Sequence, residues 1–562
     1  GNESGGWKNH DYCYKKLKEL QNSVPVHYEG VCRTPRYNYD VISKMYDSTE
    51  CIERYVNKKL PTKNYKAPYF LCEYAHAMGL GAGSLDYYWK LFYKSESLMG
   101  GCIWEWADHA VQHEDGTYTY GGDHGEYVHD SNFCSDGIVF PDRSLSTTSY
   151  NVQAVYRPID AYYVSNNKYA LRNRNYFVDS SIYEIEWNYL VNGEIIAKGI
   201  VQDVILPNSE NVITLKHPQM DTSKDCFVNF VYHRRSDGKI IAKEQIILCK
   251  NIVANKLGGA GKAICEQNDK NIVVKIDNGQ VLFDKESGKI VEYSIDGLSI
   301  TGDIGATPSV YRKPIDNFMY VKNKWKDIGL DKAKCQLNCI VESQCDNDNA
   351  KNDDNAEVVE SVSINTAYDI YLKEKCAMRM DINYLVFGNG VIDVDVKLDC
   401  DKAYDFPAVG VQFAIPNCFD NIKYYGYGDK ENYSDFKAHS VLGIFEAKTI
   451  NMFEKYIRPQ DSGNHTKVKW LAAKNAGGEG LVFRSIERSL DMSALPYDDE
   501  ALMKAEHRQE LKLGNHTIIK VDGFVRGVGS NSCGEDARDE FVNHSEIIKY
   551  KFQISPLTKA KI

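Results

Sequence analysis

The sequence lacks several features that mark particular classes of protein. It has no apolar run near the roughly 18 residues that a membrane-spanning helix needs. It has no basic excess, since its formal net charge is −11. An acidic chain with interspersed charges suits neither nucleic acid nor an anionic membrane surface. The composition therefore predicts no nucleic-acid partner and no membrane partner.

The sixteen cysteines lack a recognisable pattern. No two of them have Cys-x-x-Cys spacing, and they are scattered through segments that read as strands, so a zinc site is not indicated. We interpret them as buried free thiols of a protein in a reducing compartment, which favours a cytoplasmic location.

The start of the chain lacks an initiator Met, a signal peptide and a lead-in strand. It opens at Gly1 with what reads as the middle of a domain, and we interpret the chain as a piece of a longer protein. Its 562 residues suffice for about three domains.

Residues 1–158 alternate predicted strands and helices. Strand patterns occupy Val24–Tyr28, Asp40–Tyr46, Tyr69–Glu73 and Gly101–Trp106, with helical stretches between them. Alternation at this spacing predicts βα units and a parallel sheet. Four strands and the truncated end of a fifth would form the C-terminal half of a (β/α)8 TIM barrel.

The pattern changes after residue 158. Residues 159–252 are short alternating segments with turns at Asn192-Gly193 and Asp237-Gly238, which predict an immunoglobulin-like β-sandwich. A glycine-rich linker (253–263) leads into a third, all-β region (264–562), which we expect to be a large β-sandwich. The predicted fold class is multidomain, α/β followed by all-β.

A carboxylate at a strand end is the first candidate for chemistry. Glu73 follows a near-continuous apolar run, and a buried carboxylate is costly unless it is paired or has a shifted pKa. In a βα barrel the functional side chains gather at the carboxyl ends of strands. That rule selects Glu3, Met45, Tyr46, Glu73, His76 and Trp104. Two carboxylates facing one mouth between aromatic walls are typical of glycosidic bond cleavage.

Each of these residues also has a structural interpretation. Glu73 could be bonded into a structural network, and Glu3 could cap the helix that follows it. Tyr46 and Trp104 could be core aromatics, and His76 could be an ordinary loop histidine. Only the combination of residues favours an active site.

An ordered series of motifs carries a resemblance to a known family. The motifs are Gly1-Asn2-Glu3-Ser4-Gly5, Met45-Tyr46, Cys72 to Gly79, Gly100 to Trp106, Asn132 to Gly137 and Pro141-Asp142-Arg143, followed by Arg312 to Asn317, Gly426 to Tyr433, Tyr456 to Gln460, Asp522 to Phe524 and Gly527 to Gly534. The chain resembles the large bacterial β-galactosidases of glycoside hydrolase family 2, the LacZ type. The resemblance covers essentially all of the chain, and residues 264–562 resemble the family's C-terminal small-chain β domain.

The resemblance implies retaining hydrolysis of terminal β-D-galactosides such as lactose. By position, Glu73 matches the nucleophile, Glu3 the general acid/base, and Tyr46 a tyrosine beside the nucleophile. The positions that match galactosyl contacts, or lie in the matching loop, are Asn2, Met45, His76, Trp104, Asp130 and Phe133.

The resemblance also implies two cations. Mg²⁺ would be held partly by Glu3, and a monovalent cation, Na⁺ or K⁺, would lie near Phe133 and Asp136; hard cations with oxygen ligands suit both. Two positions depart from the family pattern. Asp136 stands where the best-known enzyme has Asn, and Cys533 follows Ser532 where some members have a sugar-stacking Trp.

The resemblance further implies partners and alternatives. The family has domains and barrel strands ahead of the position of Gly1, so a separate N-terminal part of the same enzyme is an expected partner, and the complete enzyme is an expected homo-oligomer. Another family 2 activity, β-glucuronidase or β-mannosidase, stays open, as does a non-catalytic subunit. We expect the chain alone to have weak activity or none, because half a barrel cannot close.

Overall fold

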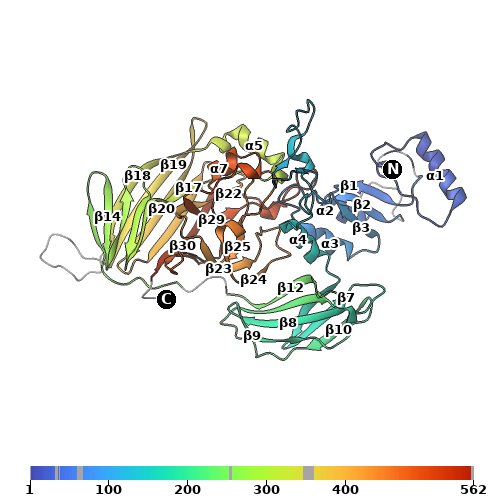
Figure 1. Ribbon diagram of the computed structural model, residues 1–562, viewed down its shortest axis with the longest axis horizontal. Coiled ribbons are helices and arrows are strands. Elements are labelled where there is room, and N and C mark those ends of the chain that lie inside the picture. Colours follow the sequence, from blue (N-terminus) through green and yellow to red (C-terminus); the bar gives the residue numbers. More distant parts are fainter. Residues whose placement is uncertain are drawn as a thin grey trace.

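The computed structural model describes residues 2–558 with gaps at 32, 33, 35, 37, 60–66, 252–255 and 346–359. The described chain is mostly β-sheet, with few helices. A small parallel sheet lies near the N-terminus and is followed by a short two-stranded sheet, β4 (Val111–Gln112) and β5 (Tyr118–Thr119). A two-sheet unit comes next, and then two nine-stranded sheets (Figure 1). Residues 253–255 of the predicted linker lie outside the described residues.

The N-terminal region is built on three parallel strands in the order β1 (Ile42–Met45), β2 (Tyr69–Tyr74) and β3 (Leu98–Ile103). The near-continuous apolar run makes β2 the central strand, with Tyr69, Leu71 and Tyr74 fully buried. The helices of this region are α1 (Lys8–Leu20), α2 (Thr49–Val56), α3 (Leu85–Phe92) and α4 (Thr147–Val155).

Local sequence sets the limits of these elements. Helix α2 begins where the Ser48 hydroxyl accepts a hydrogen bond from the Cys51 N–H at 3.2 Å, which satisfies one of the free amides of the first turn. Helices connect the successive strands, as the pairing of parallel strands requires.

The predicted strand at Val24–Tyr28 is wrong. This segment is extended but belongs to no sheet, so the described parallel sheet has three strands, not four. Pro25 has no N–H to donate to a ladder. The Val26 N–H donates to the Asp40 side chain at 2.7 Å, and the Asp40 N–H donates to the Val26 carbonyl at 3.0 Å.

The middle region is a pair of antiparallel sheets around one apolar core that contains Tyr169, Trp187 and Phe230. One sheet has the order β10 (Ser209–Thr214), β7 (Lys168–Asn173) and β6 (Ile159–Ser165). The other has the order β12 (Ile240–Cys249), β11 (Cys226–Arg234), β8 (Tyr183–Val191) and β9 (Glu194–Ile200). The predicted turns at Asn192-Gly193 and Asp237-Gly238 are confirmed, since they join β8 to β9 and β11 to β12.

The C-terminal region consists of two nine-stranded antiparallel sheets (Figure 1). The first runs β13 (Ile264–Gln267), β14 (Asn271–Ile276), β15 (Gly279–Asp284), β16 (Ile290–Ile295), β17 (Leu298–Ser309), β22 (Ala408–Pro416), β29 (His516–Val525), β28 (Leu490–Leu495) and β25 (His465–Val468). The second runs β18 (Lys334–Cys345), β19 (Ser361–Leu372), β20 (Lys375–Phe387), β21 (Ile392–Cys400), β30 (Ile547–Leu557), β27 (Gly480–Ile486), β26 (Trp470–Lys474), β23 (Asn421–Gly428) and β24 (Val441–Lys448). The short helices α5 (Val321–Ile328), α6 (Thr449–Met452) and α7 (Asp499–Lys504) lie in the connections.

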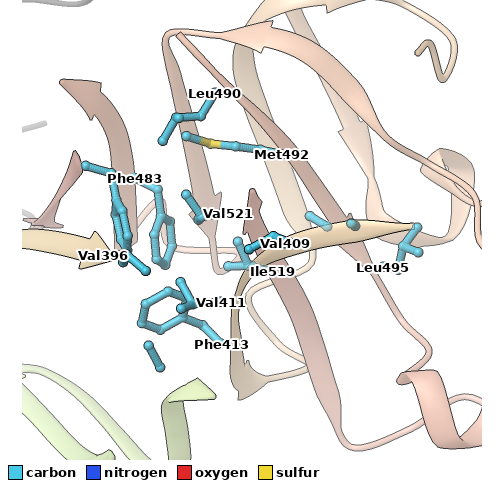
Figure 2. Packing of buried hydrophobic residues seen from close by; sticks show 14 of the residues in the cluster. Val396, Val409, Val411, Phe413, Phe483, Leu490, Met492, Leu495, Ile519 and Val521 are labelled. Atoms are coloured by element: carbon cyan, nitrogen blue, oxygen red, sulfur yellow. The ribbon is translucent and has the colours of Figure 1, made fainter. Parts of the chain in front are cut away.

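Period-two patterning explains how the large sheets bury one face. In β21 the apolar residues Ile392, Val394, Val396 and Leu398 are buried, while the intervening Asp and Lys residues are not. Figure 2 shows side chains of both sheets meeting in the core. Phe413 of β22 packs on Phe483 of β27 with ring centroids 5.0 Å apart, so its ring bridges the two sheets.

The middle region is joined to the C-terminal sheets by buried polar contacts. The Lys469 ammonium pairs with the Asp225 carboxylate, which also accepts a hydrogen bond from the Tyr425 hydroxyl. The Gln245 side chain donates to the Leu442 carbonyl and accepts from the Leu442 N–H, each at 2.9 Å. Since an unpaired buried charge is costly, these contacts fix how the two regions dock.

The fourteen cysteines whose side chains the structure describes are free thiols, but the prediction that they are buried is largely wrong. Six of these are exposed and only Cys226 is buried. Cys335 and Cys376 are the second residues of strands β18 and β20, close to strand ends. Within the described ranges, no helix is long and apolar enough to cross a membrane.

Removing the Phe413 ring should destabilise the large core strongly. Phe413→Ala leaves a cavity between the two sheets, and we expect a loss of about 3–5 kcal/mol in the free energy of unfolding. Urea-induced unfolding followed by tryptophan fluorescence would measure it. Val341→Ala, on an exposed position of β18, should change the same quantity by less than about 0.5 kcal/mol. Equal effects of the two variants would contradict this account of the core.

His465 should make the fold sensitive to acid. Burial lowers the pKa of His465 to about 4; its Nδ1 lies 3.1 Å from the Tyr427 carbonyl, and its buried Nε2 has no partner among the described residues. Because the unfolded state binds this proton near pH 6.5 and the folded state only near pH 4, stability should fall as the pH drops through that window.

His465→Asn tests this dependence, since the amide Nδ2 can replace the ring N–H toward Tyr427. Its plot of unfolding free energy against pH should be flatter between pH 6.5 and 4, by at most about 1.4 kcal/mol per pH unit. His516→Asn, at an exposed position, is the matched control. An unchanged slope in His465→Asn would refute the assignment.

Candidate active site

The carboxyl ends of the three parallel strands bring the predicted residues together. Met45 lies opposite Glu73 in the register of β1 and β2, and the Tyr46 N–H donates to the Glu73 carbonyl at 2.9 Å. The Trp104 N–H donates to the Tyr74 carbonyl at 3.2 Å. Parallel pairing therefore places side chains from three strand ends at one edge of the sheet.

Glu73 is the buried carboxylate of this edge, with 7% of its surface exposed. Its Oε1 accepts a hydrogen bond from the Asn2 amide at 3.2 Å. Burial and the adjacent Glu73 carboxylate, to which the phenol is hydrogen-bonded, raise the pKa of Tyr46 far above its usual range. Tyr46 therefore remains a phenol and acts as a donor toward Glu73.

Glu3 lies at the surface and follows Asn2 in the chain. Its neighbour Asn2 contacts Glu73, and its own backbone N–H donates to Glu29 Oε2 at 3.0 Å. The side chain of Glu3 is exposed. The alternative that Glu3 caps a helix is excluded, because α1 begins at Lys8 with Trp7 as its N-cap.

His76 and Asp136 form the second half of the site. His76 Nε2 lies 3.4 Å from Asp136 Oδ2, which also accepts a hydrogen bond from Trp104 Nε1 at 2.9 Å. The His76 ring lies between Tyr46 and Phe133, with centroid distances of 5.9 and 5.5 Å. These contacts confirm no chemical role, but they group most of the predicted residues in one cluster.

The charges of this pair follow from its contacts. Burial alone would lower the pKa of His76, but its interactions with Asp136 and with Cys533 raise the pKa to about 9. Burial opposes ionisation of Asp136 as well, yet hydrogen bonds from His76 and Trp104 hold the pKa of Asp136 below its usual range. The geometry therefore favours an imidazolium beside a carboxylate.

Asp130 does not join the cluster through its side chain. It is exposed, and its backbone carbonyl accepts the Phe133 N–H at 3.1 Å. This bond orders the turn Ser131–Cys134, which carries Phe133. Asp130 thus contributes to the position of Phe133.

Sequence reasoning missed the residues that the C-terminal region brings to the site. Ser532 Oγ lies 2.7 Å from His76 Nδ1, and the Ser532 hydroxyl donates to Asn317 Oδ1 at 2.6 Å. The Arg458 guanidinium donates to the Asn132 side chain at 3.2 Å. Ser532, Asn317 and Arg458 all belong to motifs that carry the family resemblance, but the resemblance implied no role for any of them.

A loop of the C-terminal region, Gly527 to Glu535, packs directly on the parallel sheet's connections. Asp435 accepts hydrogen bonds from the Val528 and Gly529 N–H groups, each 2.8 Å long, and the Gly83 N–H donates to the Gly529 carbonyl at 2.8 Å. A side chain at Gly83 would fall 2.5 Å from the Gly529 nitrogen, so glycine permits this close approach.

The site fits the two predicted cations unequally. Asp136 Oδ1 is buried and has no hydrogen-bond partner among the described residues, which suits a cation near Phe133. For Mg²⁺ the donor set is insufficient. The described part of the chain contains no group of three His, Cys, Asp or Glu side chains arranged to hold a metal ion, around Glu3 or elsewhere.

Comparison with known families divides the chain into three matches. "Glycosyl hydrolases family 2, TIM barrel domain" matches residues 1–161, "Beta-galactosidase, domain 4" matches 169–253, and "Beta galactosidase small chain" matches 275–555, which is half of the chain. The chain belongs to glycoside hydrolase family 2, in the LacZ-type β-galactosidase branch. The resemblance expected from the motifs is confirmed.

Curated relatives agree with this family 2 membership. A β-galactosidase of Priestia megaterium is 29% identical over 94% of this chain and 51% of its own length. Those of Actinobacillus pleuropneumoniae and Staphylococcus xylosus are 27% and 28% identical over 99% of this chain, and over 54% and 56% of theirs. The chain thus spans about half the length of the curated relatives it matches.

Weakening the anchor of the Gly527 to Glu535 loop should loosen the site. The Glu535 carboxylate accepts hydrogen bonds from the backbone and hydroxyl of Thr49, at 3.0 and 3.1 Å, and from the Tyr88 hydroxyl at 3.2 Å. Glu535→Gln should destabilise this contact by about 1–3 kcal/mol. Amide hydrogen exchange of the loop would then be faster.

Glu540→Gln is the control, because Glu540 lies in the same segment but is exposed. It should leave the exchange of the loop unchanged. Equal protection of the loop in the parent chain and in Glu535→Gln would show that the loop is held by other contacts.

Proposed function

We propose that this chain carries the catalytic carboxylates of a retaining β-galactosidase that hydrolyses terminal, non-reducing β-D-galactosides of the lactose type. The observation that carries the proposal is the buried Glu73 at the end of β2, hydrogen-bonded by Asn2, which precedes Glu3 in the chain. Family 2 membership and the names of the relatives support the same activity.

The proposed reaction is a double displacement. A Glu73 oxygen attacks the anomeric carbon while the bond to the leaving oxygen breaks, and Glu3 gives that oxygen its proton. In the second step Glu3 takes a proton from water, the water oxygen attacks the anomeric carbon, and the ester bond to Glu73 breaks. Both carboxyl groups end as they began.

The neighbours of Glu73 have supporting roles in this proposal. Tyr46 donates a hydrogen bond to the nucleophile in the free enzyme. Asn2 contacts the sugar 2-hydroxyl, where hydrogen bonds strengthen in the transition state. The other galactosyl contacts in the proposal are Met45, His76, Trp104 and Phe133, while Asp130 acts through the turn that carries Phe133.

Asp136 and the backbone of Phe133 would hold a monovalent cation, which supplies a positive charge for orienting a sugar hydroxyl. No step of the reaction is assigned to Mg²⁺, since Glu3 is the only Mg²⁺ ligand that we propose from this chain.

The domain arrangement is part of the proposal. Residues 1–158 would be the C-terminal half of a TIM barrel, 159–252 an immunoglobulin-like sandwich and 264–562 the small-chain β domain. A polypeptide that supplies the other barrel strands would complete the site, and the complete enzyme would be a homo-oligomer. Because the chain spans about half of its relatives, we expect little activity from it alone.

Covalent labelling tests the nucleophile. The chain is assayed alone and joined to the N-terminal half of the Priestia megaterium relative, with a chromogenic β-galactoside and with a 2-fluoro-galactoside. We expect one galactosyl increment on the peptide that contains Glu73. Glu73→Gln should abolish labelling and lower kcat by about four to six orders of magnitude.

Other results would overturn separate parts of the proposal. A label on another peptide would exclude Glu73 as the nucleophile. Turnover of β-glucuronides or β-mannosides in preference to β-galactosides would exclude the sugar assignment. Glu105→Gln is the matched control, because Glu105 is a nearby carboxylate with no assigned role, and its peptide should carry no label.

A further inference from the structure

A continuous chain of buried hydrogen bonds runs from the C-terminal region into the candidate site. The Asn317 amide donates to the Leu80 carbonyl at 2.7 Å, and Asn317 Oδ1 accepts from the Ser532 hydroxyl at 2.6 Å. Ser532 Oγ then meets His76 Nδ1 at 2.7 Å. Asn317, Ser532 and His76 are each no more than 1% exposed.

The direction of every bond in this chain is fixed by its first member. The Leu80 carbonyl can only accept, so the NH₂ group of Asn317 must face it and Oδ1 must face Ser532. With the amide flipped, two acceptor oxygens would meet at 2.7 Å. The Ser532 hydroxyl has one hydrogen to donate, and it donates this hydrogen to Asn317 Oδ1. Ser532 therefore accepts from His76, and His76 Nδ1 must carry a hydrogen.

The remaining contacts of His76 leave its ring a single orientation. The rings of Tyr46 and Phe133 both lie close to the His76 ring, with centroid distances of 5.9 and 5.5 Å, and Nε2 faces Asp136 Oδ2. A half-turn of the ring would place carbon atoms against both Ser532 and Asp136, and would lose both polar contacts. The chain of hydrogen bonds from Leu80 through Asn317 and Ser532 to His76, which we call the relay, therefore selects one orientation of the His76 ring.

Ser532, at the centre of the relay, is itself held in place by a tight turn. The Ser530 N–H donates to the Glu535 carbonyl at 2.8 Å and the Gly534 N–H donates to the Ser530 carbonyl, which closes a tight turn around Ser532. Glu535 ties this turn to the start of α2. A supporting residue fixed in this way can hold a site side chain in one geometry.

We propose that Ser532 and Asn317 are positioning residues, which hold the His76 ring in one orientation, with its Nδ1–H donating to Ser532 and its Nε2 directed toward Asp136 and the proposed sugar-binding space. This inference rests on the proposed function for its effect on the reaction, since His76 is assigned there as a galactosyl contact. The relay makes the C-terminal β domain part of the site's geometry, across 456 residues of sequence.

Nuclear magnetic resonance of the imidazole nitrogens tests the relay without reference to activity. The full chain is labelled with ¹⁵N-histidine, and the His76 signal is identified by its absence in His76→Gln. We expect a hydrogen on Nδ1 with slow solvent exchange in the parent chain. Ser532→Ala removes the acceptor, so this hydrogen should exchange fast or leave Nδ1.

Two substitutions of Asn317 form a matched pair. Asn317→Asp keeps an acceptor oxygen toward Ser532, whereas Asn317→Leu has a similar shape and no acceptor. Asn317→Leu also loses the bond to the Leu80 carbonyl, whereas the second carboxyl oxygen of Asn317→Asp faces that carbonyl and keeps the bond only when it is protonated. The Nδ1 hydrogen should persist in Asn317→Asp and be lost or reoriented in Asn317→Leu. Asn531→Ala, next to Ser532 but outside the relay, should leave the signal unchanged.

The kinetic arm uses the completed enzyme described above. Ser532→Ala should lower kcat/KM for a β-galactoside about tenfold, and Asn317→Asp should stay closer to the parent than Asn317→Leu. An Nδ1 without hydrogen in the parent chain would overturn the proposal, and so would a Ser532→Ala variant with unchanged signal and unchanged kcat/KM. If no β-galactoside is turned over, the proposed function fails, while the resonance measurement still decides the relay.

Discussion

The candidate site depends on the contact between a small parallel sheet and a much larger antiparallel structure. Three strands bury few residues, and such a sheet has little stability of its own. Backbone groups of Val528 and Gly529 reach the Asp435 carboxylate, and the Gly529 carbonyl reaches Gly83. Since buried polar groups must be paired, these bonds fix the strand ends against the C-terminal region at a defined distance.

The C-terminal region provides a large, well-packed base for this contact. Two nine-stranded sheets bury a single apolar core in which Phe413 and Phe483 interlock. A close-packed core deforms little, so loops rooted in its strands keep their positions. Ser532 follows β29 and Asn317 follows β17. The two relay residues of the C-terminal region therefore lie in loops that follow strands of the same sheet.

Sequence reasoning succeeded where the information is local. The apolar run before Glu73 predicts a buried strand, and the strand-end rule then selects Tyr46, Glu73 and Trp104, which the structure brings together. It failed at Val24–Tyr28, where a side chain of Asp40 replaces a strand partner. It also missed Ser532 and Asn317, which are separated by 215 residues. Their meeting is set by sheet order, and no local pattern encodes it.

The charge of the site could not be read from the sequence either. Glu105, Asp108 and Asp136 are three neighbouring carboxylates, and burial disfavours ionisation of each. Burial and the charge of Asp136 raise the pKa of Glu105, and they raise that of Asp108 to about 8. Only Asp136 has donors on its carboxylate from the ends of both β2 and β3, namely His76 and Trp104.

The pKa of Asp136 is lowered for that reason, in the opposite direction to the pKa values of Glu105 and Asp108. A family position that is Asn in the best-known enzyme therefore becomes, in this chain, the anionic partner of His76. The neighbouring acids, by contrast, have raised pKa values. The sequence reveals three acids, but only the placement of two hydrogen-bond donors decides which of them has a lowered pKa.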